Sequence, residues 1–185
     1  MAVALALQDT LSNPFAGFYV AVARQVRLND YIKLNTGEEG YVTDITWRST
    51  MIRTLQNNLI IIPNSKLAQA VVTNYHLPDK RLAIAVQVGV SYGSDPEKVE
   101  RVLLDEARTS VGVIPGLVGE PEPGVRFEPG FADSSLGFTV SCQVAGFEEQ
   151  FSVRHELRKR ILKRLEAEGI EMPFPTRTVY LRKPE

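Results

Sequence analysis

The stretch Ile52-Arg53-Thr54-Leu55-Gln56-Asn57-Asn58-Leu59-Ile60-Ile61-Ile62-Pro63-Asn64 (residues 52–64) contains two apolar β-type runs separated by a polar turn. Asparagine tolerates a positive φ, so Asn57-Asn58 predicts a tight hairpin between the two runs. Proline has no backbone N–H to donate to a sheet, so Pro63-Asn64 is expected to end the second strand. The hairpin indicates a β domain in the first half of the chain.

Further short strands are expected on the N-terminal side of this hairpin. Tyr31–Leu34 and Tyr41–Thr46 are separated by the turn-forming sequence Asn35-Thr36-Gly37-Glu38-Glu39-Gly40, and Trp47–Gln56 follows. Five short strands between about residue 30 and residue 76, joined by short turns, predict a compact β barrel rather than a β sandwich.

A different pattern begins after the polar connection at residues 74–81. Ser94 or Asp95 is expected to cap a first helix that begins at Pro96, and Ser152 to cap a second helix that Gly169 ends. Apolar residues recur at helical spacing, at Val99, Val102, Leu103 and Ala107 in the first helix and at Val153, Leu157, Ile161 and Leu165 in the second. Strands are predicted over Leu82–Val90, near Val125–Phe131 and Gly137–Val144, and over Thr178–Leu181. The order β-α-β-β-α-β places the chain in the α+β class.

Residues 1–23 carry no lysine or arginine and are mostly apolar, as a membrane helix would be. A polar cluster at residues 8–14 falls where the centre of the bilayer would lie, and polar groups there are costly. No basic start precedes the apolar part, which excludes a signal peptide. Two short helical pieces that meet at a polar kink are therefore expected, and the abrupt beginning at Met1 suggests that further sequence precedes it.

Composition limits the functions that the chain can have. The 185 residues carry 21 Lys and Arg against 22 Asp and Glu, so no overall basic excess favours nucleic acid. One cysteine, Cys142, cannot form an internal disulfide, and two histidines cannot build a usual zinc site. The sequence contains no phosphate-binding, zinc-protease or dinucleotide motif. We expect no enzyme activity, no catalytic residue, no metal and no cofactor.

Two local features are weighed against that expectation. Ser152 and His155 lie one helical turn apart, which fits an N-cap and an exposed histidine better than a nucleophile and its base. Small β barrels bind RNA in some proteins, and the basic residues that could serve here are Arg48, Arg53 and Lys66. The aromatic residues of this stretch are Tyr31, Tyr41, Trp47 and Tyr75. They are not paired and interleaved with basic residues, as they would be in a base-stacking platform.

Three stretches, in the same order along the chain, resemble the small-conductance mechanosensitive channel family. Ala6-Leu7-Gln8-Asp9-Thr10-Leu11-Ser12-Asn13-Pro14-Phe15-Ala16-Gly17 is similar to the segment where the family's pore helix kinks. Ile60-Ile61-Ile62-Pro63-Asn64-Ser65-Lys66 resembles the hairpin end of its β domain, with Pro63 and Asn64 as the motif residues and Ser65 where glycine is common. Gly169-Ile170-Glu171-Met172-Pro173-Phe174-Pro175 resembles the run before its terminal strand.

The resemblance implies a domain order and an assembly. Residues 1–25 would be the end of a pore-lining transmembrane helix and a lateral amphipathic helix, 26–80 an Sm-like β domain, 81–175 a ferredoxin-like α/β domain, and 176–185 a strand of an oligomeric β barrel. Seven copies would form a vestibule that faces the cytoplasm below an inner or plasma membrane. Tension would open the pore and release solutes after osmotic downshock, so the partners are lipid, permeating ions and other copies, with no nucleic acid.

The resemblance also assigns residues of the pore. Ala2 and Ala4 would allow neighbouring pore helices to pack closely, and Leu5 aligns with a ring of leucines that closes the pore by dewetting. Gln8 and Asp9 lie at the kink, and Asp9 replaces a glycine common in the family. A carboxylate there offers helix capping instead of backbone freedom, which predicts a stiffer kink. A ring of these carboxylates near the cytoplasmic mouth of the pore would favour cations.

Two other interpretations remain open at this point. One is a soluble, ring-forming, Sm-like protein that binds RNA, whose affinity would fall steeply with salt. The other is a purely structural cage or adaptor domain.

Overall fold

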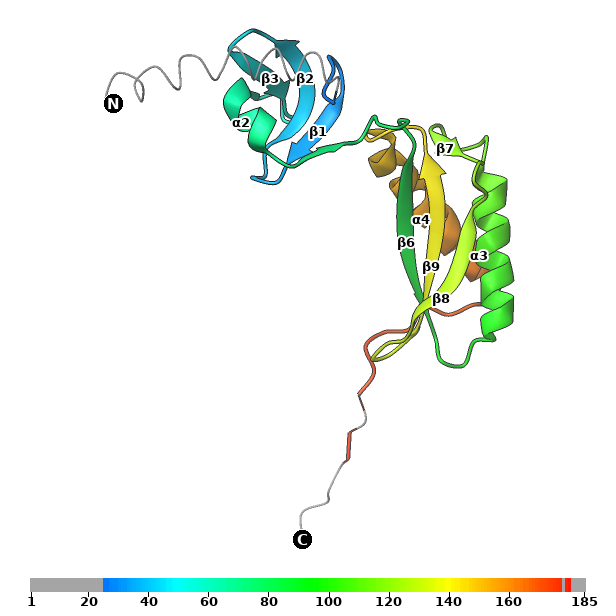
Figure 1. The fold of residues 1–185 in the computed structure, drawn as a ribbon. Helices are drawn as coiled ribbons and strands as arrows, with labels where there is room; N and C mark the ends of the chain where they lie inside the picture. Colours follow the sequence, from blue (N-terminus) through cyan, green and yellow to red (C-terminus); the bar gives the residue numbers. More distant parts are fainter. Residues whose placement is uncertain (1–24, 178, 181–185) are drawn as a thin grey trace. The chain divides into compact units, whose positions relative to one another are not determined.

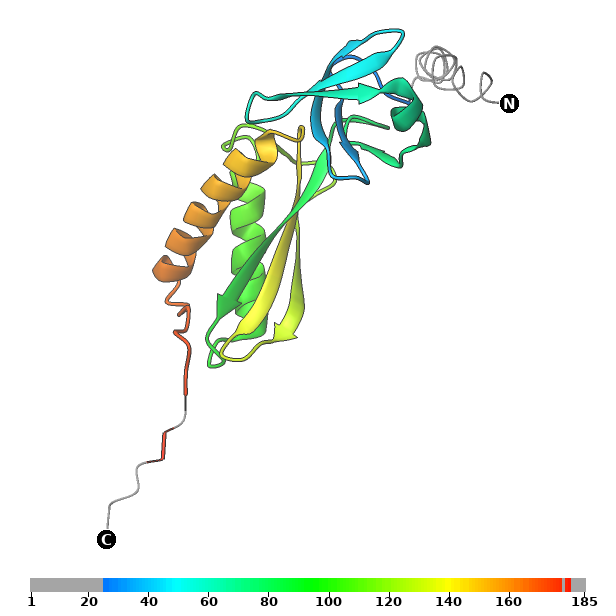
Figure 2. The same ribbon diagram turned by 90° about the vertical axis from the view of Figure 1, so that its left-hand side faces the viewer.

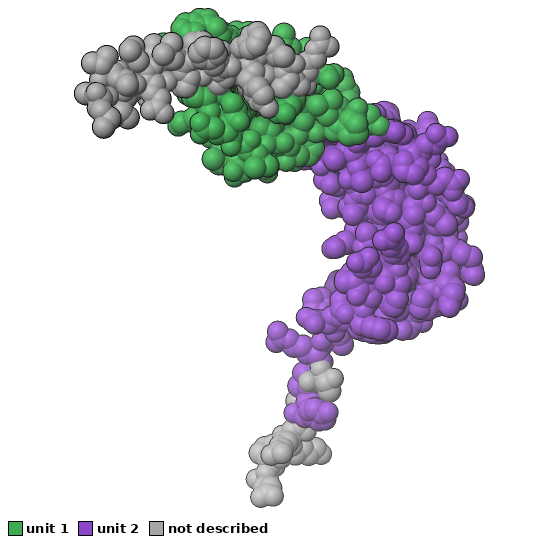
Figure 3. All heavy atoms as spheres, in the orientation of Figure 1, with its two compact units in different colours: residues 1–80 green, residues 81–185 purple. Residues whose placement is uncertain are grey.

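The computed structural model describes residues 25–177, 179 and 180, which belong to two compact units that divide between Lys80 and Arg81 (Figures 1 and 3). Each unit has its own antiparallel sheet and its own buried apolar core. Three helices complete the described part of the chain. This mixed α+β fold confirms the class that the sequence predicted.

The sheet of the first unit has the strand order β4-β3-β2-β1-β5, with every neighbouring pair antiparallel. The predicted strands are confirmed, and they run over β1 (Tyr31–Leu34), β2 (Glu39–Ile45), β3 (Ser49–Arg53), β4 (Leu59–Pro63) and β5 (Val72–Asn74). Trp47 and Arg48 lie in the turn before β3 rather than in the strand. No ladder joins the edge strands β4 and β5 among the described residues, so a closed barrel stays a prediction.

The hairpin between β3 and β4 is confirmed. The backbone N–H of Thr54 donates to the carbonyl of Asn58 at 2.9 Å, and Asn57 has φ 66°. The second strand ends at Pro63, as expected, but a short helix that the sequence did not predict, α2 (Asn64–Gln69), follows at once. Six residues are too few to show a helical repeat of apolar positions, which explains why the pattern missed it.

The core of the first unit follows from the alternation of its strands. Ile32 of β1, Val42 of β2 and Ile52 of β3 are fully buried, and Ile62 and Leu67 pack with them. Successive side chains of a strand point to opposite faces, so each strand supplies its apolar residues to one side of the sheet.

The second unit consists of one sheet with two helices on the same face (Figure 2). Along the chain its elements are β6 (Leu82–Val90), α3 (Pro96–Ser110), β7 (Leu117–Val118), β8 (Gly124–Phe131), β9 (Leu136–Val144) and α4 (Glu149–Ala167). β9 is central, because β6, β7 and β8 all pair with it. The two-residue β7 was not predicted, since it lies in a loop rich in glycine and proline.

The two predicted helix stripes are buried, as expected. Val99, Leu103 and Ala107 of α3 and Val153, Leu157, Ile161 and Leu165 of α4 are at most 3% exposed, and Val102 is 7% exposed. They pack on every second residue of β6 and β9, on the face of the sheet that the helices cover. Val86 of β6 and its partner Val140 of β9 are among these apolar residues. The pattern of one apolar stripe per helix therefore located the core correctly.

One predicted helix cap is confirmed and one is wrong. Asp95 accepts a hydrogen bond from the N–H of Glu97 at 3.1 Å, with Pro96 at the first helical position. Ser152 does not cap α4, because the helix already begins at Glu149 and the hydroxyl donates to the Glu149 carbonyl at 3.1 Å. Serine within a helix satisfies its hydroxyl on a preceding carbonyl in this way.

The terminal strand predicted over Thr178–Leu181 is not seen. Val179 and Tyr180 lie in no strand and are 72% and 89% exposed, whereas Thr178 and residues 181–185 lie outside the described residues. A strand needs a partner for its backbone groups. No described strand pairs with this segment, so a barrel shared between copies stays a prediction.

Cys142 lies on the buried face of β9, and burial raises the pKa of its thiol to about 11. The thiolate is the reactive form, so the thiol should resist a disulfide reagent at pH 7.5 in the folded chain. We expect one thiol to react per chain after unfolding in urea, at least about 100-fold faster than before. Fast reaction of the native chain would contradict the burial.

Candidate functional site

Asn64, one of the two predicted motif residues of the β domain, is fully buried at the start of α2. Its Oδ1 accepts a hydrogen bond from the hydroxyl of Thr50 at 2.9 Å, and its Nδ2 donates to the carbonyl of Thr46 at 2.9 Å. Its backbone N–H donates to the carbonyl of Arg48 at 3.0 Å. We call this set, Asn64 with Thr46, Arg48 and Thr50, the Asn64 latch. It fastens the start of α2 to the turn between β2 and β3.

Pro63, the other motif residue, ends the edge strand β4 opposite Ser49 of β3. It has φ −57°, close to the value that the proline ring imposes, and it stands where a sheet tolerates the loss of an N–H. Pro63 thus ends the ladder, and Asn64 turns the chain into α2. The two motif residues together make the transition from β4 to α2.

A second buried polar group, at the beginning of β1, was not found by sequence reasoning. Oδ2 of Asp30 accepts hydrogen bonds from the N–H of Arg27 at 2.9 Å and from Nδ2 of Asn74 at 2.7 Å. Asn74 also donates to the carbonyl of Gln25 at 2.9 Å, and Nδ1 of His76 lies 3.7 Å from Oδ1 of Asp30. The cluster fixes the first described residues to the end of β5.

The tyrosines considered for RNA binding do not form an open platform. Tyr31 is fully buried, and its ring contacts Tyr41 and Tyr75 edge-on at centroid distances of 4.9 and 5.7 Å. Burial, together with the carboxylate of Glu39, raises the pKa of Tyr31 above its ordinary range. These rings serve the packing of the sheet rather than base stacking.

The basic residues considered for RNA binding are exposed and lie near the two ends of β3 and on α2. Arg48 precedes β3 and Arg53 ends it, so they lie near opposite ends of this strand. Lys66 lies on α2. The carbonyl of Arg48 accepts a hydrogen bond from the N–H of Asn64, so Arg48 lies near the start of α2, whereas Arg53 lies at the other end of β3.

The third motif begins with the C-terminal cap of α4. Gly169 has φ 67° and its N–H donates to the carbonyl of Glu166 at 3.2 Å, while the N–H of Ile170 donates to Leu165 at 2.9 Å. This is the Schellman arrangement that ends many helices at glycine. The carbonyl of Glu171 then accepts from the N–H of Ser91 at 2.8 Å, which ties the motif to the end of β6.

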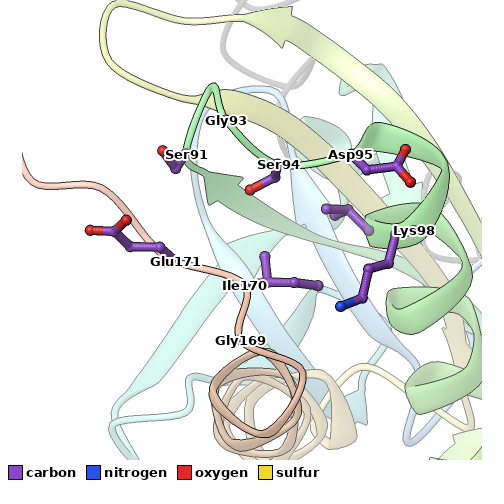
Figure 4. Close-up of a pocket in the computed structure, with 9 residues that line it drawn as sticks. Ser91, Gly93, Ser94, Asp95, Lys98, Gly169, Ile170 and Glu171 are labelled. Carbon is purple, nitrogen blue, oxygen red and sulfur yellow. The ribbon is translucent and has the colours of Figure 1, made fainter.

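A cavity of about 320 Å³ lies between this motif and the beginning of α3 (Figure 4). Lys98 extends from α3 toward the Gly169–Ile170 segment, and its Nζ donates to the carbonyl of Glu168 at 2.9 Å. The carboxylate of Asp95 is used in capping α3. Lys98 thus ties α3 to the end of α4, and Asp95 holds the start of α3, so both charged groups have structural partners at this junction.

Replacing Gly169 by alanine should destabilise the second unit by about 1 kcal/mol, since the left-handed conformation is unfavourable for residues with a Cβ. A Cβ at Gly169 would meet nothing within 4 Å, so the cost is conformational and not steric. Gly93→Ala is the matched control, because that position is equally open and lacks a positive φ. Urea unfolding followed by circular dichroism gives both values, and equal stabilities for the two variants would contradict the cap.

Ser152 and His155 do not form a catalytic pair. The Ser152 hydroxyl is bonded to Glu149, and the exposed His155 lies beside Glu156, with Nε2 and Oε1 3.6 Å apart. Among the described residues there is no cluster of three potential metal ligands, and no helix there has the length and hydrophobicity to cross a membrane. The predicted pore residues Ala2, Ala4, Leu5, Gln8 and Asp9 lie outside the described residues.

Two family models match successive parts of the chain. Residues 9–77 match the mechanosensitive ion channel beta-domain, and residues 84–172 match the C-terminal domain of the mechanosensitive ion channel MscS. The small-conductance mechanosensitive channel MscMJ of Methanocaldococcus jannaschii is 36% identical over 185 residues, which cover 99% of this chain and 51% of that protein. The chain thus spans about half the length of this relative.

Solved structures agree with these matches. The crystal structure of Helicobacter pylori MscS in a closed state has a TM-score of 0.84 and 29% identity, over 99% of this chain and 70% of that one. Arabidopsis thaliana MSL1 has a TM-score of 0.71 at 20% identity, over 94% and 62% of the two chains, and shares the fold. The matched families are channel families, not enzymes. With its β domain and C-terminal domain in sequence, the chain belongs to the MscS family of mechanosensitive channels.

Proposed function

We propose that this chain is the cytoplasmic vestibule and the pore-helix end of a tension-gated ion channel that releases solutes after osmotic downshock. The observation that carries the proposal is the match of both domains, in order, over nearly the whole chain. A channel responds to tension when its open state occupies more membrane area than its closed state, because tension then stabilises the open state.

The proposed assembly is a homoheptamer whose β domains form a ring below an inner or plasma membrane. Supporting this, Leu59 and Ile61 on the edge strand β4 are 54% and 58% exposed. An edge strand with outward apolar residues is a surface that another chain can cover. Ions would pass through side openings of the cage, and the terminal residues 176–185 would form a barrel between copies. The domain boundaries at about residues 25, 80 and 175 belong to this proposal.

The proposed gate lies in residues 1–25. Leu5 from each copy would narrow the pore to an apolar constriction that excludes water, and Ala2 and Ala4 would let the helices approach closely. Gln8 and Asp9 would form the kink. The Asn64 latch and the Asp30 cluster would then give the lateral helix a rigid base, because the cluster holds the backbone at Gln25, where that helix would end.

A chimera tests the proposal. Residues 1–185 are joined to the membrane part of Helicobacter pylori MscS at the aligned position and studied by patch clamp. We expect channels that open under suction. Leu5→Ser should lower the opening tension, since a polar ring hydrates the pore. Leu7→Ser is the matched control, because two residues along the proposed pore helix its side chain would point about 200° away from that of Leu5.

Three outcomes would count against the proposal. A chimera that reaches the membrane without tension-activated current contradicts the channel function, and equal effects of the two serine variants contradict the gate. A particle of the isolated chain in mild detergent with six copies and bound RNA would favour the Sm-like alternative. The expected mass is seven times 20.6 kDa.

A further inference from the structure

A cavity of about 380 Å³ lies beside α4, on the side of the loop between α3 and β7. Its volume falls in the range of small-molecule sites. The α4 residues that line it are spaced at i, i+3, i+4 and i+7, so they form one stripe of the helix. Apolar Val113 and Pro115 face that stripe, which consists of Glu156, Lys159, Arg160 and Lys163.

The charges of this cavity are not balanced. Nζ of Lys159 is bonded to Glu156 at 3.0 Å, and this ion pair, with a contribution from Lys163, holds the pKa of Glu156 below its ordinary value. Lys163 has no ion-pair partner of its own in the part of the chain that the structure describes. The ammonium group of Lys163 therefore lines the cavity without forming a direct ion pair in the described part of the chain, although Glu156 lies on the same stripe.

The side chain of Arg160 is held in place by a buried carboxylate of α3. Its Nε donates to Oε1 of Glu106 at 2.7 Å, and the Glu106 side chain is only 9% exposed. Within residues 25–177 no other hydrogen bond is made by the guanidinium. Because the guanidinium is planar, fixing Nε also fixes the plane of the two terminal nitrogens. Glu106 thus positions the guanidinium of Arg160, whose two terminal nitrogens can still donate hydrogen bonds to an anion.

We propose that this cavity binds a small organic anion, with the phosphate or carboxylate group on Arg160 and Lys163 and the apolar part against Val113 and Pro115. A charged group on a guanidinium and an ammonium makes charge-assisted hydrogen bonds, which are the stronger kind. The apolar wall adds burial that inorganic phosphate or chloride cannot use. The inference does not depend on the channel proposal, since it concerns only residues of the second unit.

Isothermal titration calorimetry on residues 1–185 at constant ionic strength tests the site, with phenyl phosphate as the probe. We expect saturable binding with Kd on the order of millimolar, and several-fold weaker binding of inorganic phosphate, which lacks the apolar part. Lys163→Gln should weaken phenyl phosphate binding about tenfold, because one charge-assisted hydrogen bond is lost. Lys163→Arg should restore most of it.

Arg158→Gln is the matched control, because Arg158 is an exposed cation of α4 outside the cavity. It should change the affinity less than twofold. Equal weakening by Lys163→Gln and Arg158→Gln would show diffuse attraction to a basic helix and overturn the site. Equal affinity for phenyl phosphate and inorganic phosphate would overturn the role of Val113 and Pro115, and no binding at 20 mM (about twenty times the expected Kd) would overturn the proposal as a whole. Unchanged circular dichroism confirms that each variant is folded.

Discussion

Asn64→Ala should destabilise the first unit by about 2–4 kcal/mol. The substitution leaves the Thr50 hydroxyl, which is fully buried, without the acceptor that it has in the latch. It also removes the donor to the carbonyl of Thr46. A buried polar group that loses its partner costs its desolvation in full, and two groups are affected here. Small units have little stability in reserve, so a loss of this size should unfold part of the population.

Tryptophan fluorescence measures this effect selectively. Trp47 is the single tryptophan of the chain, and it lies between Thr46 and Arg48, which both bond to Asn64. Urea unfolding followed at this residue should show a lower midpoint for Asn64→Ala than for the unchanged chain. Asn64→Asp should be at least as damaging, because it replaces the Nδ2 donor by a second acceptor and buries a charge.

Asn58→Ala serves as the control for asparagine in the same hairpin. Its backbone groups bond to Thr54, and its side chain is exposed. The change should shift stability by no more than about 0.5 kcal/mol. If Asn58→Ala and Asn64→Ala had equal effects, the latch would not be the source of the stability.

Arg160→Met should destabilise the second unit by about 3 kcal/mol. Glu106 of α3 is buried and its partner is Arg160 of α4, at 2.7 Å. Removing the arginine leaves a carboxylate in a low-dielectric site without its counter-charge, which is the costly way to break such a pair. Methionine keeps most of the side-chain volume, so packing between the two helices changes little.

A second substitution separates the charge from the packing. Adding Glu106→Gln to Arg160→Met should recover at least about half of the loss, because no buried charge then remains. Arg158→Met, on an exposed part of the same helix, should be within about 0.5 kcal/mol of the unchanged chain. Urea unfolding followed by circular dichroism at 222 nm measures all four proteins. A double variant as unstable as Arg160→Met would contradict the interpretation.

The two latch-like features have the same consequence for a channel domain. The Asn64 latch joins helix α2 to the turn before β3. The ion pair of Glu106 and Arg160 joins helices α3 and α4, which cover one face of the second sheet (Figure 2). Buried polar pairs of this kind make one arrangement of the elements much more stable than its alternatives. We therefore expect the elements joined by each of these contacts to keep one arrangement relative to each other.

The sequence by itself determined what depends on neighbours within a few residues. The alternation of apolar and other residues predicted the strand Leu82–Val90 with the bounds that the structure has. Helical spacing predicted the buried stripes of α3 and α4, Asp95-Pro96 marked the start of α3, and Gly169 marked the end of α4. These signals are local because strands and helices repeat every two or 3.6 residues. Motif order along the chain also pointed to the channel family.

Tertiary structure alone decided what the polar residues do. Asn64 meets partners 14 and 18 residues away, Asp30 meets Asn74 at a separation of 44, and Glu106 meets Arg160 at 54. Such contacts leave no periodic trace in the sequence, and each residue looks like an ordinary exposed one until the fold buries it. The Ser152 cap failed for a related reason, since the packing of α4 begins a turn before the serine. Local patterns set the elements, and long-range burial set the roles of the residues between them.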